Sequence, residues 1–123
     1  MKRVEPKKVK QRDSPELKIR NAIRSMLWER DWLCETTHGN EYQQGFPDLF
    51  CAHKIHGMRW VEVKLPDMIG SSFTKAQMEK FPKFCEHGAG IWILTAATEH
   101  EYKKLFDVCN FWYYYMKKKG QGW

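Results

Sequence analysis

Residues 48–65 constrain the fold most, because two strand-like segments are joined there by a very short connection. The segment 48–53 is mostly apolar, the segment 59–65 alternates between apolar and polar residues, and a turn over 54–57 separates them. Strands joined by so few residues can pair only antiparallel, since a parallel pair needs a crossover of about a dozen or more residues. We therefore expect a sheet that contains a β-hairpin.

Capping signals and apolar periodicity place the remaining elements. Ser14 and Pro15 open a helix over about 15–30, whose apolar side chains follow the three-and-four spacing of one buried stripe. Thr74 begins a second helix, with Gln77 as the far member of a capping box. The other expected elements are strands over 32–37, 91–94 and 111–115 and a helix from Thr98 to about 106.

The order helix, three strands, helix, strand, helix indicates an α/β fold. It is a sandwich in which helices flank a central mixed β-sheet, with hairpins on one side and one strand returned by a helical crossover. The 123 residues, 42% of them hydrophobic, suffice for one core and not for two. We expect one domain over residues 14–116, preceded by a flexible basic arm over 1–13 and followed by a basic tail over 117–123.

Hydropathy and cysteine usage exclude some classes of protein. No apolar run approaches the roughly 20 residues of a membrane span, and the charged N-terminus lacks an apolar signal segment, so we expect a soluble protein that is not exported. The cysteines at 34, 51, 85 and 109 form no Cys-x-x-Cys pair, and reduced thiols are expected. Histidines near them make loose clusters, but none has the spacing of a structural zinc site.

The net charge of +6 is concentrated at the two ends of the chain. Residues 1–20 carry eight Lys and Arg against three acids, and Lys117, Lys118 and Lys119 add three more bases. Basic ends are often only solvated termini, yet they also bind phosphates by counterion release. Composition therefore points slightly towards a nucleic-acid partner.

The hairpin brings three charged residues together. If its loop is 54–56, the register places Asp48 opposite Glu62, and Lys64 shares the face of Glu62 because side chains alternate along a strand. Adjacent carboxylates repel one another unless a cation lies between them, and their hard oxygen atoms suit Mg²⁺ or Mn²⁺. Such an ion can polarise a phosphodiester, and Lys64 could orient or deprotonate a water or neutralise the phosphate.

Each of these residues also has a purely structural explanation. Glu62 and Lys64 suit a solvated cross-strand face, and Asp48 after Pro47 is a common turn residue. Glu16 lies on the buried stripe of the first helix, where its carboxylate either stabilises the helix start or belongs to a site. The residue pattern leaves these explanations open.

Taken together, the residues resemble a known nuclease family. Pro47-Asp48, followed after thirteen residues by Glu62-Val63-Lys64, is similar to the PD-(D/E)XK signature. Gly45-Phe46-Pro47-Asp48-Leu49 with Thr74-Lys75-Ala76-Gln77 downstream resembles its VRR-NUC branch, over about residues 14–96. The resemblance implies a restriction-endonuclease-like fold.

The same resemblance implies roles for individual residues. Asp48, Glu62 and the backbone carbonyl of Val63 would be metal ligands, Glu16 would complete the acidic cluster, and Lys64 would be the catalytic lysine. Gln77 matches the downstream glutamine of the family, although its capping role explains it equally well.

The function implied by the resemblance is a Mg²⁺-dependent DNA endonuclease, a phosphodiester hydrolase in which Mn²⁺ would substitute. Standalone domains of this branch are typically viral and resemble Holliday-junction resolvases that act as homodimers. We therefore expect branched or junction DNA as substrate, a homodimer that uses outward rings of residues 111–115, and a cytoplasmic location in a bacterial or infected cell. Two alternatives stay open: a restriction-type or repair-type nuclease with another DNA target, and a nucleic-acid-binding module without catalysis.

Overall fold

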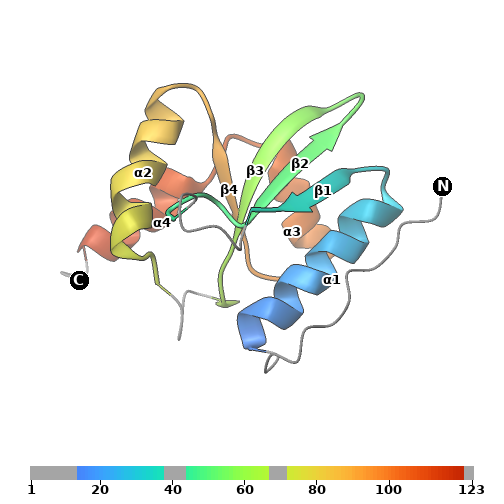
Figure 1. The fold of residues 1–123 in the computed structure, drawn as a ribbon, viewed down its shortest axis with the longest axis horizontal. Coiled ribbons are helices and arrows are strands. Elements are labelled where there is room, and N and C mark those ends of the chain that lie inside the picture. Colours follow the sequence, from blue (N-terminus) through green and yellow to red (C-terminus); the bar gives the residue numbers. More distant parts are fainter. Residues whose placement is uncertain (1–13, 38–43, 67–71, 121–123) are drawn as a thin grey trace.

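The structure, a computed structural model, describes residues 14–37, 44–66 and 72–120. Its elements in chain order are α1 (Pro15–Glu29), β1 (Leu33–Thr36), β2 (Leu49–His53), β3 (Gly57–Val63), α2 (Lys75–Glu86), β4 (Ile91–Leu94), α3 (Glu99–Lys103), the 3-10 helix η3 (Lys104–Phe106) and α4 (Phe111–Gly120) (Figure 1). The strands expected over 32–37 and 91–94 and the helix expected from Thr98 to about 106 are thereby confirmed.

The strands form one mixed sheet in the order β1-β2-β3-β4. β1, β2 and β3 pair antiparallel, and β4 pairs parallel to β3 after the crossover through α2. The expected hairpin is confirmed, with Leu49 opposite Val61 and Phe50 opposite Trp60. Continuing this register by one residue brings Asp48 to Glu62, as the short loop predicts.

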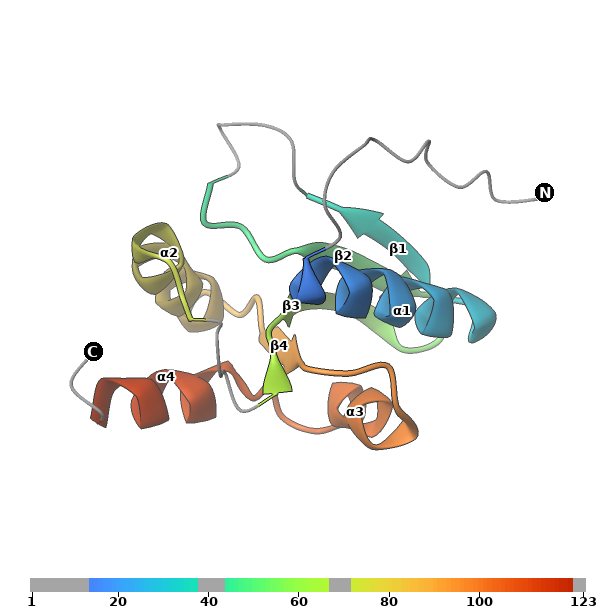
Figure 2. The same ribbon diagram turned by 90° about the horizontal axis from the view of Figure 1, so that it is seen from below.

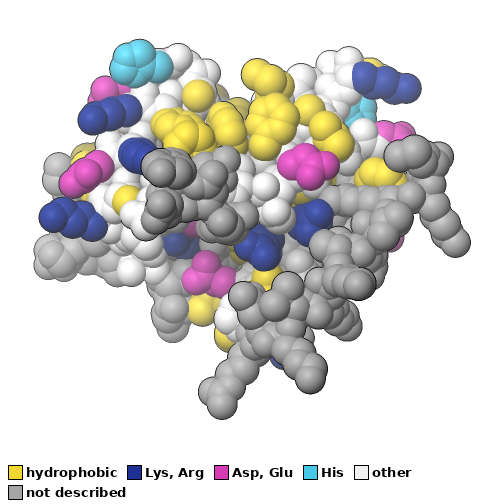
Figure 3. Space-filling model, viewed as in Figure 1, with side chains coloured by type: hydrophobic (Ala, Val, Ile, Leu, Met, Phe, Trp, Pro, Cys, Tyr) yellow, Lys and Arg dark blue, Asp and Glu magenta, His cyan; other side chains and the backbone are white. Residues whose placement is uncertain are grey.

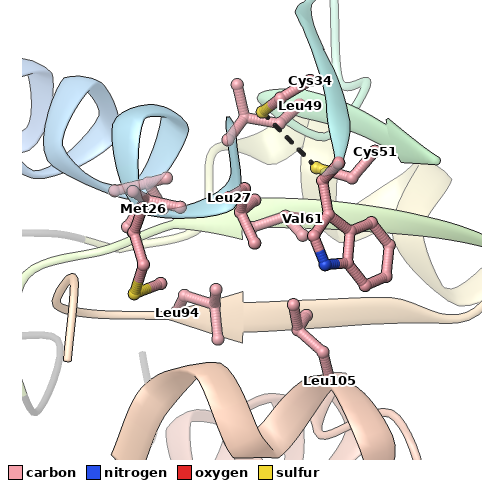
Figure 4. Close-up of a cluster of buried hydrophobic side chains, with 11 residues drawn as sticks. Met26, Leu27, Cys34, Leu49, Cys51, Val61, Leu94 and Leu105 are labelled. Atoms are coloured by element: carbon pink, nitrogen blue, oxygen red, sulfur yellow. Dashed lines mark hydrogen bonds between the residues drawn. The ribbon is translucent and has the colours of Figure 1, made fainter. Parts of the chain in front are cut away.

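Helices cover both faces of the sheet, with α1 and α3 on one side and α2 and α4 on the other (Figures 1 and 2). Side chains of α1, η3 and all four strands meet in the first core, part of which is shown in Figure 4. A second core lies under α2 and α4. The first core contains Ile23, Met26, Leu27, Trp32, Cys34, Leu49, Cys51, Val61, Val63, Leu94 and Leu105, and the second contains Phe73, Phe81, Ile91, Ile93 and Phe111.

The two long helices begin where the capping signals predict. Ser14 Oγ accepts a hydrogen bond from Leu17 N at 3.1 Å at the start of α1. The capping box at the start of α2 is complete, since the side chains of Thr74 and Gln77 each accept a hydrogen bond from the backbone N–H of the other. α2 continues past Pro82 to Glu86, and the neighbouring Phe81 and Phe84 pack into the second core.

Residues 111–115 form the start of α4, and the last strand expected there was wrong. Phe111 and the tyrosines three and four residues later have helical spacing and pack into the second core. The outer edge of β4, where another strand would pair, is occupied by Asn110, whose side chain accepts a hydrogen bond from Ile93 N at 2.6 Å and donates one to Ile93 O at 2.9 Å. Because all five residues of this run are aromatic, the sequence shows no alternation of apolar and polar residues from which a helix could be told from a strand.

Several expectations concern the ends and loops of the chain. α4 reaches Gly120, so residues 117–120, expected at the start of a basic tail, are helical. The expected arm over 1–13 and residues 121–123 of the expected tail lie outside the described residues, as do residues 38–43 and 67–71. Within the described ranges, no helix is both long enough and apolar enough to cross a membrane.

Candidate active site

Asp48 lies directly before β2, at the end of the hairpin opposite its loop. Its backbone N donates a hydrogen bond to Glu62 Oε1 at 3.0 Å, and its Oδ2 accepts one from Val63 N at 2.8 Å. Each carboxylate thus binds a backbone N–H of the opposite chain segment, directly beyond Leu49 and Val61, the last paired residues of β2 and β3. This exchange holds the two acidic side chains in fixed positions, and both are buried, with 7% of Asp48 and 1% of Glu62 exposed.

Lys64 and Gln77 complete a cluster around Glu62. Lys64 Nζ lies 3.2 Å from Glu62 Oε2, and it donates hydrogen bonds to Gln77 Oε1 at 3.2 Å and to Ser72 O at 2.8 Å. Gln77 Nε2 donates to Glu62 Oε2 at 2.9 Å. The structure therefore brings together four of the predicted site residues, namely Asp48, Glu62, Lys64 and Gln77. All four are buried.

Gln77 caps the start of α2 and also contacts the charged cluster. Its Oε1 accepts hydrogen bonds from Thr74 N at 3.0 Å and from Lys64 Nζ, while its Nε2 binds Glu62. The first contact closes the capping box, and the other two fix the lysine and the carboxylate. The start of α2 is thus tied directly to the end of β3.

The segment before Asp48 is held by α2. Gly45 has a φ of 79°, and a Cβ atom at this position would lie 2.8 Å from Ala76 O, so the close approach to α2 requires glycine. Lys80 Nζ donates a hydrogen bond to Gln44 O at 2.6 Å. These contacts give the glycine of the Gly45-to-Leu49 motif a physical reason: it lets the chain pass α2 and enter β2 at Asp48.

Burial and the neighbouring Asp48 carboxylate raise the pKa of Glu62 to about 8, and the Lys64 ammonium opposes this rise. The two carboxylates thus repel each other in an environment that excludes water. A cation beside them would favour the ionised form of both. Lys64 supplies one such charge, and its ammonium is fixed by oxygen atoms of Glu62, Ser72 and Gln77.

The residues present fit a small divalent cation. Proteins hold Mg²⁺ by one or two carboxylates, with water and substrate oxygens completing the shell, and Asp48 and Glu62 provide two adjacent carboxylates of this kind. Glu16 lies in the first turn of α1 and is partly buried. Among the described residues, no group of three or more His, Cys, Asp and Glu side chains could hold a metal ion. The structure thus does not bring Glu16 to the other two acids as a third ligand.

Sequence reasoning missed two neighbours of Lys64. One is the backbone carbonyl of Ser72, and the other is the ring of Phe73, whose centroid lies 5.4 Å from Lys64 Nζ. A carbonyl contact has no signature in the sequence, because every residue carries one. Phe73 has a weak signal, since it is a large apolar residue placed directly before the cap Thr74.

A comparison with solved structures finds the same fold elsewhere. The chain is similar to a structure described as "VRR_NUC domain", with a TM-score of 0.62 and 17% sequence identity, over 76% of this chain and 97% of that one. No protein-family model and no curated protein matches the sequence. At this identity the likeness concerns the fold, and it confirms the restriction-endonuclease-like sandwich of the VRR-NUC type that the motifs predicted.

Proposed function

We propose that this protein is a Mg²⁺-dependent DNA endonuclease that hydrolyses phosphodiester bonds, acts in the cytoplasm and prefers branched or junction DNA. The observation that supports it most is the buried cluster of Asp48, Glu62, Lys64 and Gln77. A protein that only binds nucleic acid has no use for this arrangement, because burying charged groups costs stability. The similarity to a VRR_NUC domain supports the same class of activity.

Asp48, Glu62 and the carbonyl of Val63 are the proposed ligands of the ion. Glu16, which the structure does not bring to the other two acids, is proposed to join them only when the ion is bound. When bound, Mg²⁺ or Mn²⁺ supplies positive charge that stabilises the negative charge developing on the reacting phosphate. Lys64 is the proposed donor to that phosphate or to the attacking water, and it would have to exchange one of its present contacts with Glu62, Ser72 and Gln77 to act in this way. Gln77 keeps Lys64 and Glu62 at their separation through one hydrogen bond to each.

A symmetric homodimer is the second part of the proposal. A four-way junction presents two equivalent strands, and two copies of one active site related by a two-fold axis can address both. Helix α4 carries exposed apolar side chains on the face turned away from the core: Trp112, Tyr113 and Met116 are 37%, 64% and 62% exposed. This face is the proposed contact between the two copies.

The activity is tested by incubating the protein with an end-labelled four-way junction, a linear duplex and a single strand, each with Mg²⁺ and with EDTA. We expect cleavage that requires Mg²⁺ and is fastest on the junction. Equal cleavage of the duplex would favour a restriction-type or repair-type nuclease. Absence of cleavage under all conditions, with DNA still bound, would favour the module without catalysis.

A further inference from the structure

Two arginines on α1 have a buried donor without an acceptor. The Nε atoms of Arg20 and Arg24 are shielded from solvent, and neither has a hydrogen-bond partner among the described residues. A buried donor left in this state costs free energy, and such groups are rare in folded proteins. The same defect occurs at two positions one helical turn apart, and an external anion could accept from these donors only if both side chains turn outward when it binds.

The two arginines lie in one row along α1, between Glu16 and Trp28, because residues four apart share a helix face. This row is turned towards the edge of the sheet: Trp28 borders a surface hollow together with Leu33 of β1 and Ala52 of β2. Figure 3 shows Lys and Arg side chains at the surface where α1 passes β1. Arg20 and Arg24 therefore face the flank where α1 meets β1.

The position of Arg24 is supported independently. The hydrogen bond with Cys34 and burial raise the pKa of the Cys51 thiol far above its usual range, and the charge of Arg24 opposes this effect. The guanidinium thus lies near β2, beside the pair of cysteines shown in Figure 4. A thiol is a poor acceptor for a guanidinium, so this neighbour does not satisfy the donor.

The N-terminal end of this row of residues on α1 lies near the candidate active site. The end of β1, the start of β2 and the end of β3 lie at the same edge of the sheet, since Thr36 pairs with Leu49 and Leu49 with Val61. The first turn of α1 lies near the end of β3 (Figures 1 and 2). From there, Arg20 and Arg24 follow along the helix, with a rise of about 1.5 Å per residue.

We propose that Arg20 and Arg24 form a phosphate-binding site that holds the DNA backbone along α1 and sets the position of the scissile bond relative to Asp48 and Glu62. This inference rests on the proposed nuclease function. The guanidinium group suits this ligand because its fork of donors matches phosphate oxygens in pairs. Contacts of this kind carry no sequence information, as expected for an enzyme that recognises the shape of its DNA.

The test compares three variants that each remove one positive charge, namely Arg20→Gln and Arg24→Gln on α1 and the control Arg30→Gln at the C-cap of this helix. Arg30 is matched in residue type and caps the same helix, but its guanidinium already binds Met26 O and Glu99 Oε2. Affinity for a labelled four-way junction is measured in Ca²⁺ over a range of salt concentrations, and thermal unfolding is measured without DNA. Cleavage is measured separately in Mg²⁺.

We expect Arg20→Gln and Arg24→Gln each to weaken DNA binding about tenfold or more and to reduce the slope of log K against log salt by about 0.9. Arg30→Gln should change affinity less than about threefold. The melting temperature of the first two variants should not fall below that of the wild type, because neither Nε has a hydrogen-bond partner among the described residues. This pattern would support the site even if no cleavage were found, in which case the proposed activity alone would fail.

The inference is overturned if Arg20→Gln and Arg24→Gln bind DNA as tightly as Arg30→Gln does, with the salt slope of the wild type. A fall in melting temperature with unchanged DNA affinity would overturn it as well, since it would show that the arginines pair within the protein. In both cases cleavage by the wild type would leave the proposed function standing.

Discussion

Gln77 connects the cap of a helix with the charged cluster, and these two contributions can be separated by mutation. Gln77→Ala removes the hydrogen bonds to Glu62 and Lys64 together with one half of the capping box. We expect it to lower the free energy of unfolding by about 1–3 kcal/mol and to slow cleavage at least about tenfold. Urea unfolding and single-turnover cleavage rates measure the two effects.

Thr74→Ala is the matched control for this prediction. It removes the other half of the capping box, the hydrogen bond from Gln77 N, and touches neither Glu62 nor Lys64. Its cost should be about 1 kcal/mol of stability, with a cleavage rate close to that of the wild type. Equal slowing of cleavage by both variants would mean that Gln77 acts through the helix start alone.

Glu16 presents a different question at the residue scale, because its place in the ligand set is a proposal. If its carboxylate helps to hold the ion, Glu16→Gln should raise the Mg²⁺ concentration needed for half-maximal cleavage about tenfold or more, with little change in stability. A titration of the single-turnover rate with Mg²⁺ measures this. An unchanged Mg²⁺ dependence would assign Glu16 to the helix start only.

Among the elements, α3 is attached to the sheet by one buried acid. Glu101 Oε1 accepts hydrogen bonds from Thr95 N at 2.8 Å and Thr95 Oγ1 at 3.0 Å, and its other oxygen pairs with Lys104. Burial alone would raise the pKa of Glu101, but the bonds from Lys104 and Thr95 hold it below the usual value of 4.5. A lowered pKa means that the ionised form stabilises the folded state at neutral pH and that this contribution is lost in acid.

We therefore expect Glu101→Gln to cost about 1–2 kcal/mol of stability at about pH 7. The difference from the wild type should shrink as the pH falls below 4.5, through the lowered pKa of the folded state. Chemical unfolding at several pH values measures it. The control is Glu99→Gln on the same helix, whose exposed pair with Arg30 should contribute less than about 0.5 kcal/mol. A difference in the free energy of unfolding between the wild type and Glu101→Gln that persists unchanged in acid would contradict this role of Glu101.

The elements also show what could be predicted from sequence. With the loop taken as residues 54–56, the placement of Asp48 beside Glu62 followed from counting residues, and the observed register of β2 and β3 has this loop. The helix over residues 111–115 could not be predicted in this way, because aromatic residues have a high strand propensity. In the structure, Asn110 occupies the edge of β4 where a further strand would pair, and one face of the helix packs into the second core. The contact of Lys64 with Ser72 O depends on the tertiary fold alone.

At the scale of the whole molecule, the proposed dimer depends on α4. Light scattering should give about twice the chain mass of 14.8 kDa, and Tyr113→Glu with Met116→Glu should shift it towards the monomer, because both side chains are exposed on the outer face of the helix. Val108→Glu is the control, since Val108 is 88% exposed but precedes α4. A wild-type monomer at micromolar concentration that cuts both strands of a junction in one binding event would refute the dimer.

The central claim is that the buried cluster at the end of the hairpin cleaves DNA. It is tested most directly by single-turnover cleavage of a labelled four-way junction in Mg²⁺ by Asp48→Asn, Glu62→Gln and Lys64→Met, with Glu101→Gln as a buried acid outside the cluster. We predict that each of the three reduces the rate at least about 100-fold while DNA binding is largely kept, and that the control cleaves like the wild type. A folded variant of any of the three that cleaves at the rate of the wild type would contradict the claim.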